Sequence, residues 1–448
     1  MRVFPVEHRE IAGRPRAYIV WGIDDATHEV VGATFRPREA KIGNEELENW
    51  LLKLLDPRID FGITEIELNG RPVVIIEVPP APGKPVRFSG VESIRVGSYT
   101  KKLRDFPEKE RSLWKTFNTT PFENTVAIEH ATADDVLAWI DYPKYFDLIG
   151  QSLPDNRTTI LQRLDSERII AQETGDRYSV TNLGAVLFAR DLKRFARLAR
   201  KALRVIIYKG TNRVETIKEH VSGQGYAIGF EGAIGYINDQ LPHNEQIGKA
   251  LRKEVRMYPE IAIRELVANA LIHQNFNITG AGPMVEVFTD RMEITNPGEP
   301  LIETLRFIDE PPKSRNESLA SLMRRMAICE ERGSGIDKVI SQVELFQLPA
   351  PDFRVAGSST VTVLYGPRTF RQLSRVERSR ACYQHACLQY VCGQRMTNTS
   401  IRKRLGMPEK SYPQASRIIR DAVNEKLIKP YTEVAASRRD VSYVPFWA

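Results

Sequence analysis

The pattern of apolar and polar positions predicts one helix with a candidate chemical face. Five apolar residues recur at helical spacing and form a single apolar face: Ile261, Leu266, Val267, Ala270 and Leu271. Glu265 and Asn269 are four residues apart, so they share the neighbouring face of this helix. A carboxylate beside a carboxamide can hold a hydrated divalent cation while the carboxylate orients or deprotonates a water. The alternative is a surface Glu and Asn on an ordinary amphipathic helix.

After this helix, apolar and polar residues alternate with a period of two. Residues 284–288 and 291–295 are predicted to form two short strands, and Asn296-Pro297-Gly298 ends the second one. Gly333-Ser334-Gly335 then opens a predicted helix over 337–345. A Gly-x-Gly at a helix start lets backbone N–H groups approach phosphates, and the helix dipole supports this. By itself this motif is a weak signal.

The order of E-x-x-x-N helix, hairpin, N-P-G and G-S-G-I resembles a known family. It is similar to the divergent GHKL (Bergerat-fold) ATPase domain of RecG-C-terminal-like bacterial proteins, over roughly residues 258–345. The resemblance implies ATP and Mg²⁺ as cofactors, Glu265 as the catalytic base and Asn269 as the metal ligand. It also implies a set of nucleotide-binding residues: Asn269, His273, Asn296, Gly298, Arg315, Asn316, Gly333, Ser334 and Gly335.

The sequence departs from the wider superfamily, which contains gyrase, MutL and the histidine kinases, at the first glycine box. Asn296 stands where those proteins have an Asp that receives the adenine amino group, and Glu299-Pro300 follows Gly298 in place of a second glycine. An Asn can still accept a hydrogen bond from an amine, but it brings no charge.

The N-terminal part predicts an α+β domain, residues 1–117. Two hairpins are predicted, one over 17–35 and one around Asn69-Gly70, and 44–55 has helical periodicity. The segments Y-I-V-W-G-I-D-D, V-V-I-I-E-V-P-P and S-I-R-V-G-S-Y-T-K-K-L resemble the Schlafen-type AlbA-like domain, whose members bind nucleic acid and in some cases cut it. The acidic N-terminal stretch of that family is not found before Ala17, so we expect an N-terminally incomplete domain without nuclease activity.

Two polar segments have alternative interpretations. Asp24-Asp25 could hold a metal, but a hairpin turn rich in turn-forming residues is favoured. In the predicted α/β spacer, residues 118–255, the basic run Lys193 to Arg204 could contact phosphates or form a solvated face.

The C-terminal part, residues 368–448, resembles a winged helix-turn-helix. A helix over 381–392, a short helix over 401–405 and a longer helix over 411–427 precede two strand-like stretches. The longer helix is the predicted recognition helix, and Arg438-Arg439 the wing tip. The expected DNA contacts are Arg402, Lys403, Arg404, Gln414, Arg417, Arg420, Arg438 and Arg439. The alternative is a protein-docking three-helix unit.

Charge favours the DNA interpretation. The chain has a net charge of +7, and residues 371–448 hold 15 Lys and Arg against 6 Asp and Glu, a balance of +9 that leaves −2 for the remainder. A basic segment favours a polyanion partner. Double-stranded DNA is the expected partner, with RNA and a second copy of the chain as further candidates.

Length and composition predict a soluble multidomain α+β protein. A length of 448 residues corresponds to about three domains, and the resemblance places a Bergerat-type α/β sandwich over 256–367. Apolar runs are too short to span a membrane, and no signal core is found, so we expect a cytoplasmic protein without membrane contact. The 4 Cys lack zinc-site spacing and are expected to be buried or half-buried free thiols.

Three functions fit these features. The favoured one is a nucleotide-responsive DNA-binding protein, a transcriptional regulator or DNA-transaction factor. The second is an enzyme, either a weak ATPase or a Schlafen-type nuclease in defence against foreign DNA. The third is a scaffold whose nucleotide site has degenerated.

Overall fold

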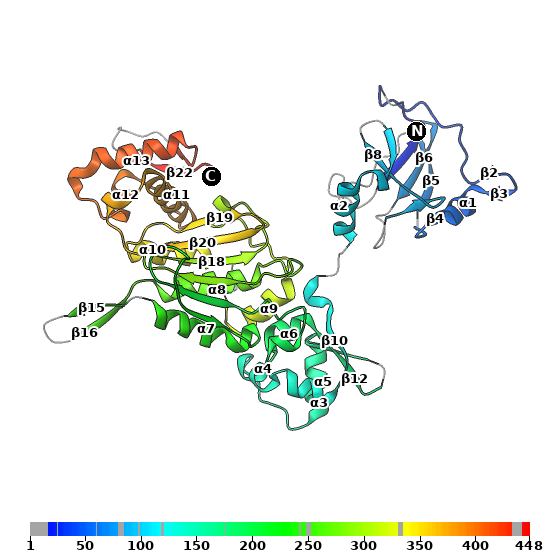
Figure 1. The fold of residues 1–448 in the computed structure, drawn as a ribbon. Helices are drawn as coiled ribbons and strands as arrows, with labels where there is room; N and C mark the ends of the chain where they lie inside the picture. The colour runs from blue at the N-terminus through cyan, green and yellow to red at the C-terminus, as the bar shows by residue number, and fades with distance from the viewer. Residues whose placement is uncertain are drawn as a thin grey trace. The chain divides into compact units, whose positions relative to one another are not determined.

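The chain folds into two compact units, residues 1–120 and 121–448 (Figure 1). The computed structural model describes residues 17–24, 26–59, 61–78, 85–96, 99–117, 121–173, 175–241, 243–247, 252–329, 335–431 and 441–448. Helices and strands are both abundant in each unit, which confirms the α+β multidomain class. Among the described residues, no helix is long and apolar enough to cross a membrane.

The first unit contains small antiparallel sheets. One has the order β1-β6-β5 and another the order β4-β7-β8-β9. Its elements are β1 (Ala17–Trp21), β2 (Lys41–Ile42), β3 (Glu45–Glu46), α1 (Leu47–Leu54), β4 (Leu55–Asp56), β5 (Gly62–Leu68), β6 (Arg71–Val78), β7 (Arg87–Phe88), β8 (Val91–Val96), β9 (Tyr99–Lys102) and α2 (Pro107–Phe117).

One of the two predicted hairpins in this unit is confirmed. β5 and β6 pair around Asn69 and Gly70, which both have positive φ, as a two-residue turn of this type requires. The other prediction, a hairpin over 17–35, is wrong. The segment after the turn forms no strand and makes only a single bridge, between Ile23 and Val30. β1 pairs instead with β6, far away in the sequence.

The second unit is built on a six-stranded mixed sheet with the order β14-β13-β17-β18-β20-β19. β13 pairs parallel with β17, and the other neighbours are antiparallel. The strands are β13 (Arg204–Tyr208), β14 (Thr216–Val221), β17 (Met284–Val287), β18 (Arg291–Pro297), β19 (Asp352–Ala356) and β20 (Ser359–Tyr365). Because β13 and β14 precede residue 256, the predicted boundary at 255/256 falls inside one sheet.

Three helices cover one face of this sheet: α7 (Tyr226–Gln240), α8 (Glu260–Ile272) and α10 (Gly335–Leu345) (Figure 1). Val267 of α8 and Val339 of α10 join the apolar strand residues Val285 and Ile294 in one buried core. Each large apolar side chain buried here contributes about 1.5–3 kcal/mol. α9 (Glu317–Arg325) also packs into this core, and β15 (His243–Ile247) and β16 (Arg252–Arg256) form a separate ribbon.

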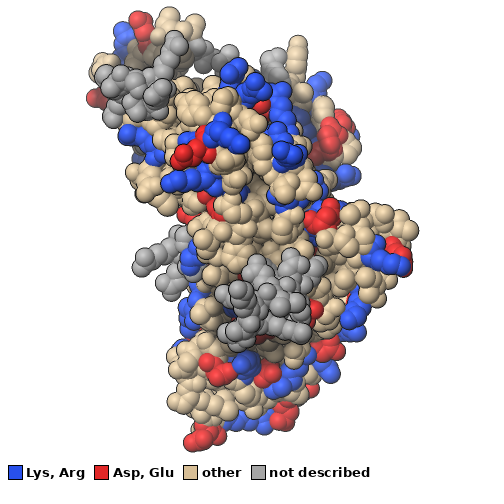
Figure 2. Space-filling view, turned by 90° about the vertical axis from the view of Figure 1, so that its left-hand side faces the viewer, with Lys and Arg blue, Asp and Glu red and all other residues tan. Residues whose placement is uncertain are grey.

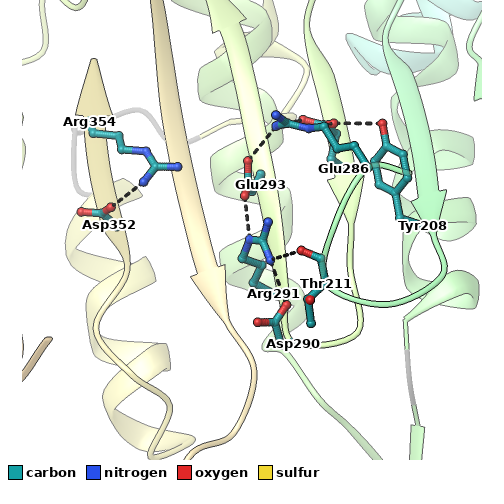
Figure 3. Close-up of polar contacts among 9 residues, drawn as sticks. Tyr208, Thr211, Glu286, Asp290, Arg291, Glu293, Asp352 and Arg354 are labelled. Carbon is teal, nitrogen blue, oxygen red and sulfur yellow. Dashed lines mark hydrogen bonds and ion pairs between the residues drawn. The ribbon is translucent and has the colours of Figure 1, made fainter. Parts of the chain in front are cut away.

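The opposite face of the sheet carries a network of ion pairs (Figure 3). Glu286 and Glu293 are partners on neighbouring strands, and both carboxylates are buried. Arg213 bridges them, with contacts of 2.6 and 2.7 Å to Glu286 and 3.0 Å to Glu293, and Arg291 lies 2.6 Å from Glu293. The network therefore fixes the loop after β13 on the sheet.

A helical subdomain precedes the sheet in the chain. It contains β10 (Val126–Thr132), α3 (Ala133–Trp139), α4 (Tyr142–Leu148), α5 (Arg157–Ser166), β11 (Ile170–Gln172), β12 (Arg177–Thr181) and α6 (Asn182–Phe188). Thr132 and Asp135 form a capping box at α3, and Thr181 accepts from the N–H of Gly184 at the start of α6.

The C-terminal subdomain consists of three helices and a short hairpin. They are α11 (Arg375–Val391), α12 (Asn398–Arg404), α13 (Tyr412–Asn424), β21 (Ile428–Pro430) and β22 (Tyr443–Pro445). Thr397 caps α12. The subdomain has its own apolar core, which also takes in Ile340 of α10 and Ala350. It is therefore packed onto the sheet subdomain through α10.

Candidate functional site

A cavity of about 500 Å³ lies among α8, the ends of β18 and β20, α9 and the start of α10. Glu265, Asn269 and His273 line it at four-residue intervals along α8. Their spacing places them on one face, while Val267 and Leu271 on another face are buried in the core. The structure thus brings together three side chains that the sequence nominated from one helix.

The start of α10 meets this face of α8. A Cβ on Gly335 would lie 2.7 Å from Oε2 of Glu265 and 3.8 Å from Nδ2 of Asn269. A side chain at position 335 would displace the carboxylate of Glu265, so the glycine is what allows the start of α10 to approach it this closely. The other two residues of the predicted motif, Gly333 and Ser334, lie outside the described residues.

Asn296 lines the cavity from the end of β18. Its side chain is buried, and its Nδ2 has no hydrogen-bond partner among the described residues. Thr360, which is its partner on β20, lines the same cavity. Buried amide donors are nearly always paired, so this N–H group calls for an acceptor from a ligand or a water.

Two more of the predicted residues, Gly298 and Arg315, lie beside each other near the end of β18. Gly298 has φ of 106°, and a Cβ there would lie 2.8 Å from Cβ of Asn275. Arg315 lines the cavity, but its two terminal nitrogens donate to the carbonyl oxygens of His273 (3.1 Å) and Glu299 (2.9 Å). Arg315 therefore ties the segment after β18 to the end of α8.

His273 is a neutral imidazole in this environment. Burial, followed by repulsion from Arg315, lowers the pKa of His273 to about 4.

Asn316 is not a cavity residue: its buried Nδ2 donates to the carbonyl oxygens of Ile272 (2.7 Å) and Gln274 (2.8 Å). Its position is structural, since it joins the start of α9 to the end of α8.

The sequence predicts a helix from Arg315 to about Ile328, and the family resemblance implies that this segment lies over the nucleotide, but the residues that α9 contributes to the cavity were not predicted. Glu317, Ala320 and Arg324 line it from one face of this helix, and Lys313 lines it from the preceding segment. Their i, i+3, i+7 spacing places them on one face of α9, but the spacing does not show that this face meets a cavity. The described residues contain no group of three or more His, Cys, Asp or Glu side chains that could hold a metal ion.

The predicted DNA-contacting residues fall into three groups. Gln414, Arg417 and Arg420 are exposed on α13, opposite its buried apolar face, and Lys403 is exposed on α12. Figure 2 shows Lys and Arg side chains grouped over the upper part of the molecule, on the side that carries α12 and α13. Arg438 and Arg439 lie outside the described residues.

The other two arginines of α12 are engaged within the protein. Arg402 donates to the side chains of Asn398 (3.0 Å) and Thr399 (3.1 Å) and to the carbonyl oxygen of Glu409 (3.0 Å). Arg404 is buried, and it donates to the carbonyl oxygen of Leu348 at 2.8 Å. Arg404 therefore faces the sheet subdomain, in contrast to the exposed position that a DNA contact requires.

The Asp24-Asp25 segment and the cysteines were also given predicted environments. Asp24 accepts hydrogen bonds from the backbone N–H groups of Ala26 (3.0 Å) and Thr27 (2.8 Å), which supports the turn interpretation, while Asp25 lies outside the described residues. All four cysteines are free thiols, but Cys392 is exposed, unlike the buried Cys382.

Comparisons with known proteins match two parts of the chain. Residues 14–104 match the family described as "Schlafen, AlbA_2", and residues 280–364 match the family described as "Putative ATP-dependent DNA helicase recG C-terminal". The expected architecture, an AlbA_2 domain followed by a RecG C-terminal-like domain, is confirmed.

A solved structure is similar to the whole chain at low identity. It is the crystal structure of the DIP2311 protein from Corynebacterium diphtheriae, with 17% identity and a TM-score of 0.46, covering 96% of this chain and 82% of that chain. No curated protein matches the chain.

Proposed function

We propose that this protein binds DNA in response to a nucleotide held in the cavity beside α8. The observation that carries the proposal is the convergence of Glu265, Asn269, Asn296 and Gly335 on one cavity of about 500 Å³. Such a volume suits a drug-sized or nucleotide-sized ligand. The family match over residues 280–364 supports a nucleotide as the ligand.

ATP with Mg²⁺ fits the donor set. The unpartnered Nδ2 of Asn296 offers a hydrogen bond to a ring nitrogen, and its amide oxygen can accept from an exocyclic amine. Because Gly335 carries no side chain, the backbone at the start of α10 can approach a phosphate closely. Asn269 would hold Mg²⁺, which neutralises phosphate charge and is usually held by few protein oxygens together with phosphates and waters.

Hydrolysis is a second candidate activity, and Glu265 is the residue that favours it. Its carboxylate lines the cavity one turn from Asn269, a position from which it can orient a water or accept a proton. Binding without turnover would suit a sensor, and turnover would suit a switch that resets itself.

DNA is the proposed partner of the C-terminal subdomain, taken as a winged helix-turn-helix. The order of α11, α12, α13 and the β21–β22 hairpin supports this, together with a bridge between Met396 and Tyr443. Gln414, Arg417 and Arg420 are exposed on α13 and suit contacts with base edges in the major groove.

α10 supplies a physical link between the two sites. Gly335 at one end adjoins Glu265 in the cavity, Ile340 joins the core of the C-terminal subdomain, and Glu344 at the other end pairs with buried residues of that subdomain. A ligand that shifts the start of α10 would therefore also act on α11 and α12, which hold His385 and Arg404.

The test is duplex binding by the full chain with and without nucleotide. Fluorescence anisotropy is measured with duplex DNA, single-stranded DNA and RNA, each with no ligand, ATP–Mg²⁺ or ADP–Mg²⁺. We expect duplex DNA to bind best and its affinity to change at least fivefold with ATP–Mg²⁺. Equal affinities in all ligand states would contradict nucleotide response, and absence of DNA binding would contradict the partner.

A further inference from the structure

Three cationic side chains line the cavity among the described residues, and they differ in what they already contact. Arg315 donates to two backbone carbonyl oxygens, and Nζ of Lys313 lies 3.7 Å from a carboxylate oxygen of Glu310. Arg324 pairs with no carboxylate and donates no side-chain hydrogen bond within the described part of the chain. A half-buried guanidinium in that state has donors available for an anion.

The helix fixes the direction of this side chain. Leu319, Leu322 and Met323 are buried on the core side of α9, whereas Arg324 lies on the cavity side. The next residue, Arg325, points away, because its guanidinium makes a two-pronged ion pair with Glu167 at 2.6 and 2.9 Å. Two adjacent arginines thus have separate environments, and only one of them lines the cavity.

The positive end of α9 is already neutralised from another part of the chain. The buried carboxylate of Glu123 accepts from the backbone N–H groups of Ser318 (2.8 Å) and Leu319 (2.7 Å). Helix N-termini bind anions through these groups, and here an acidic side chain takes the place. Of the described α9 residues that line the cavity, Arg324 in the last turn is the one with a cationic side chain.

We propose that Arg324 forms a phosphate subsite of the cavity, with the phosphate chain of a nucleotide as its ligand. This inference rests on the proposed function, because it takes the cavity as a nucleotide site. Cys329 lines the cavity just beyond α9, and Gly335 lines it where α10 begins. Arg324 would thus contribute, from α9, phosphate contacts additional to those at the start of α10. Its planar donors suit paired contacts with phosphate oxygens.

The test compares ligands that share a base but differ in phosphates. Binding of ATP, ADP and adenosine to the full chain is measured by calorimetry for wild type, Arg324→Gln, Arg324→Lys and Arg325→Gln. We expect Arg324→Gln to weaken ATP binding about tenfold or more, to weaken adenosine binding little, and Arg324→Lys to lie between. Arg325→Gln, the matched control on the same helix, should leave all three affinities unchanged.

Two outcomes would overturn the subsite. One is unchanged ATP affinity in Arg324→Gln, and the other is an equal loss for ATP and adenosine, which would indicate a general disturbance of the cavity. Inorganic tripolyphosphate is titrated in parallel. If wild type binds no nucleotide, this titration shows whether the phosphate subsite fails as well. If tripolyphosphate binds and Arg324→Gln removes it, the subsite stands without the nucleotide; if it does not bind, the subsite is wrong.

Discussion

Nδ1 of His385 on α11 donates a hydrogen bond to Oε2 of Glu344 on α10 at 2.9 Å. The same carboxylate lies 3.2 Å from Nε of Arg404 on α12, and all three side chains are largely buried. One carboxylate therefore joins two helices of the C-terminal subdomain to the helix whose first residue adjoins the cavity. The C-terminal subdomain is attached at this point by directed contacts as well as by apolar packing.

Replacing Glu344 should disconnect the two sites. Glu344→Gln leaves the buried guanidinium of Arg404 without its counter-charge, and breaking a buried pair costs about 3 kcal/mol. We expect a lower free energy of unfolding, ATP affinity close to wild type, and loss of the ATP effect on duplex affinity. Chemical denaturation and anisotropy measure these quantities. Glu425→Gln, just after the end of α13, is the control; this carboxylate lies 3.8 Å from Arg375. An ATP effect of wild-type size in Glu344→Gln would rule out this link.

Acid should weaken the second unit through His273. Its pKa of about 4 in the folded state lies below its usual 6.5, so the neutral form is favoured by folding. The stabilisation is complete above about pH 6.5 and is lost as the pH falls towards 4. Denaturation midpoints of wild type and His273→Gln are compared from pH 7.5 to pH 4. The advantage of wild type should shrink over that window, and a constant difference would count against a buried neutral imidazole.

The ion-pair network on the other sheet face should matter for stability alone. Arg213→Ala leaves the buried carboxylates of Glu286 and Glu293 with less positive charge, since one arginine bridges both. We expect a loss of about 3 kcal/mol in the free energy of unfolding, near the lower end for buried pairs because Arg213 is itself 59% exposed. ATP affinity should not change, because the cavity lies on the opposite face. A stable variant would show that Arg291 alone balances both acids.

If α13 contacts base edges, replacing one of its exposed residues should weaken binding to a preferred duplex more than binding to a random duplex. Arg417 is exposed on α13, so Arg417→Ala should cost about 1–3 kcal/mol on a preferred duplex and little on random duplex. The preferred duplex is first obtained by selection from a random pool. Arg375→Ala, which removes a cation bound to Asp421, is a control for charge alone. Equal losses on both duplexes would assign Arg417 to phosphate contact.

Local patterns in the sequence predicted the elements that depend on neighbours along the chain. The spacing of Glu265 and Asn269 placed them on one face of a helix, and the Asn69-Gly70 turn fixed the pairing of β5 with β6. Both features are decided within a few residues, by helical periodicity and by backbone conformation.

Features that depend on distant partners could not be read in the same way. Arg404 belongs to a basic run that suggested a DNA contact, but it is buried against Glu344, which lies sixty residues earlier in the chain. Arg324 was not selected, since its interest comes from lining a cavity shared with α8 and from the lack of a carboxylate partner among the described residues. Such relationships arise from tertiary packing, which no local period encodes.

The most direct test of a nucleotide site beside α8 is calorimetric titration of the full chain with ATP, with and without Mg²⁺. Wild type should bind ATP more tightly with Mg²⁺, Asn269→Ala should lose that enhancement, and Glu265→Gln should bind while showing no phosphate release. Thermal unfolding of each variant checks that the fold is retained. Equal ATP affinity in wild type and Asn269→Ala would contradict the metal assignment, and no ATP binding by wild type would contradict the account as a whole.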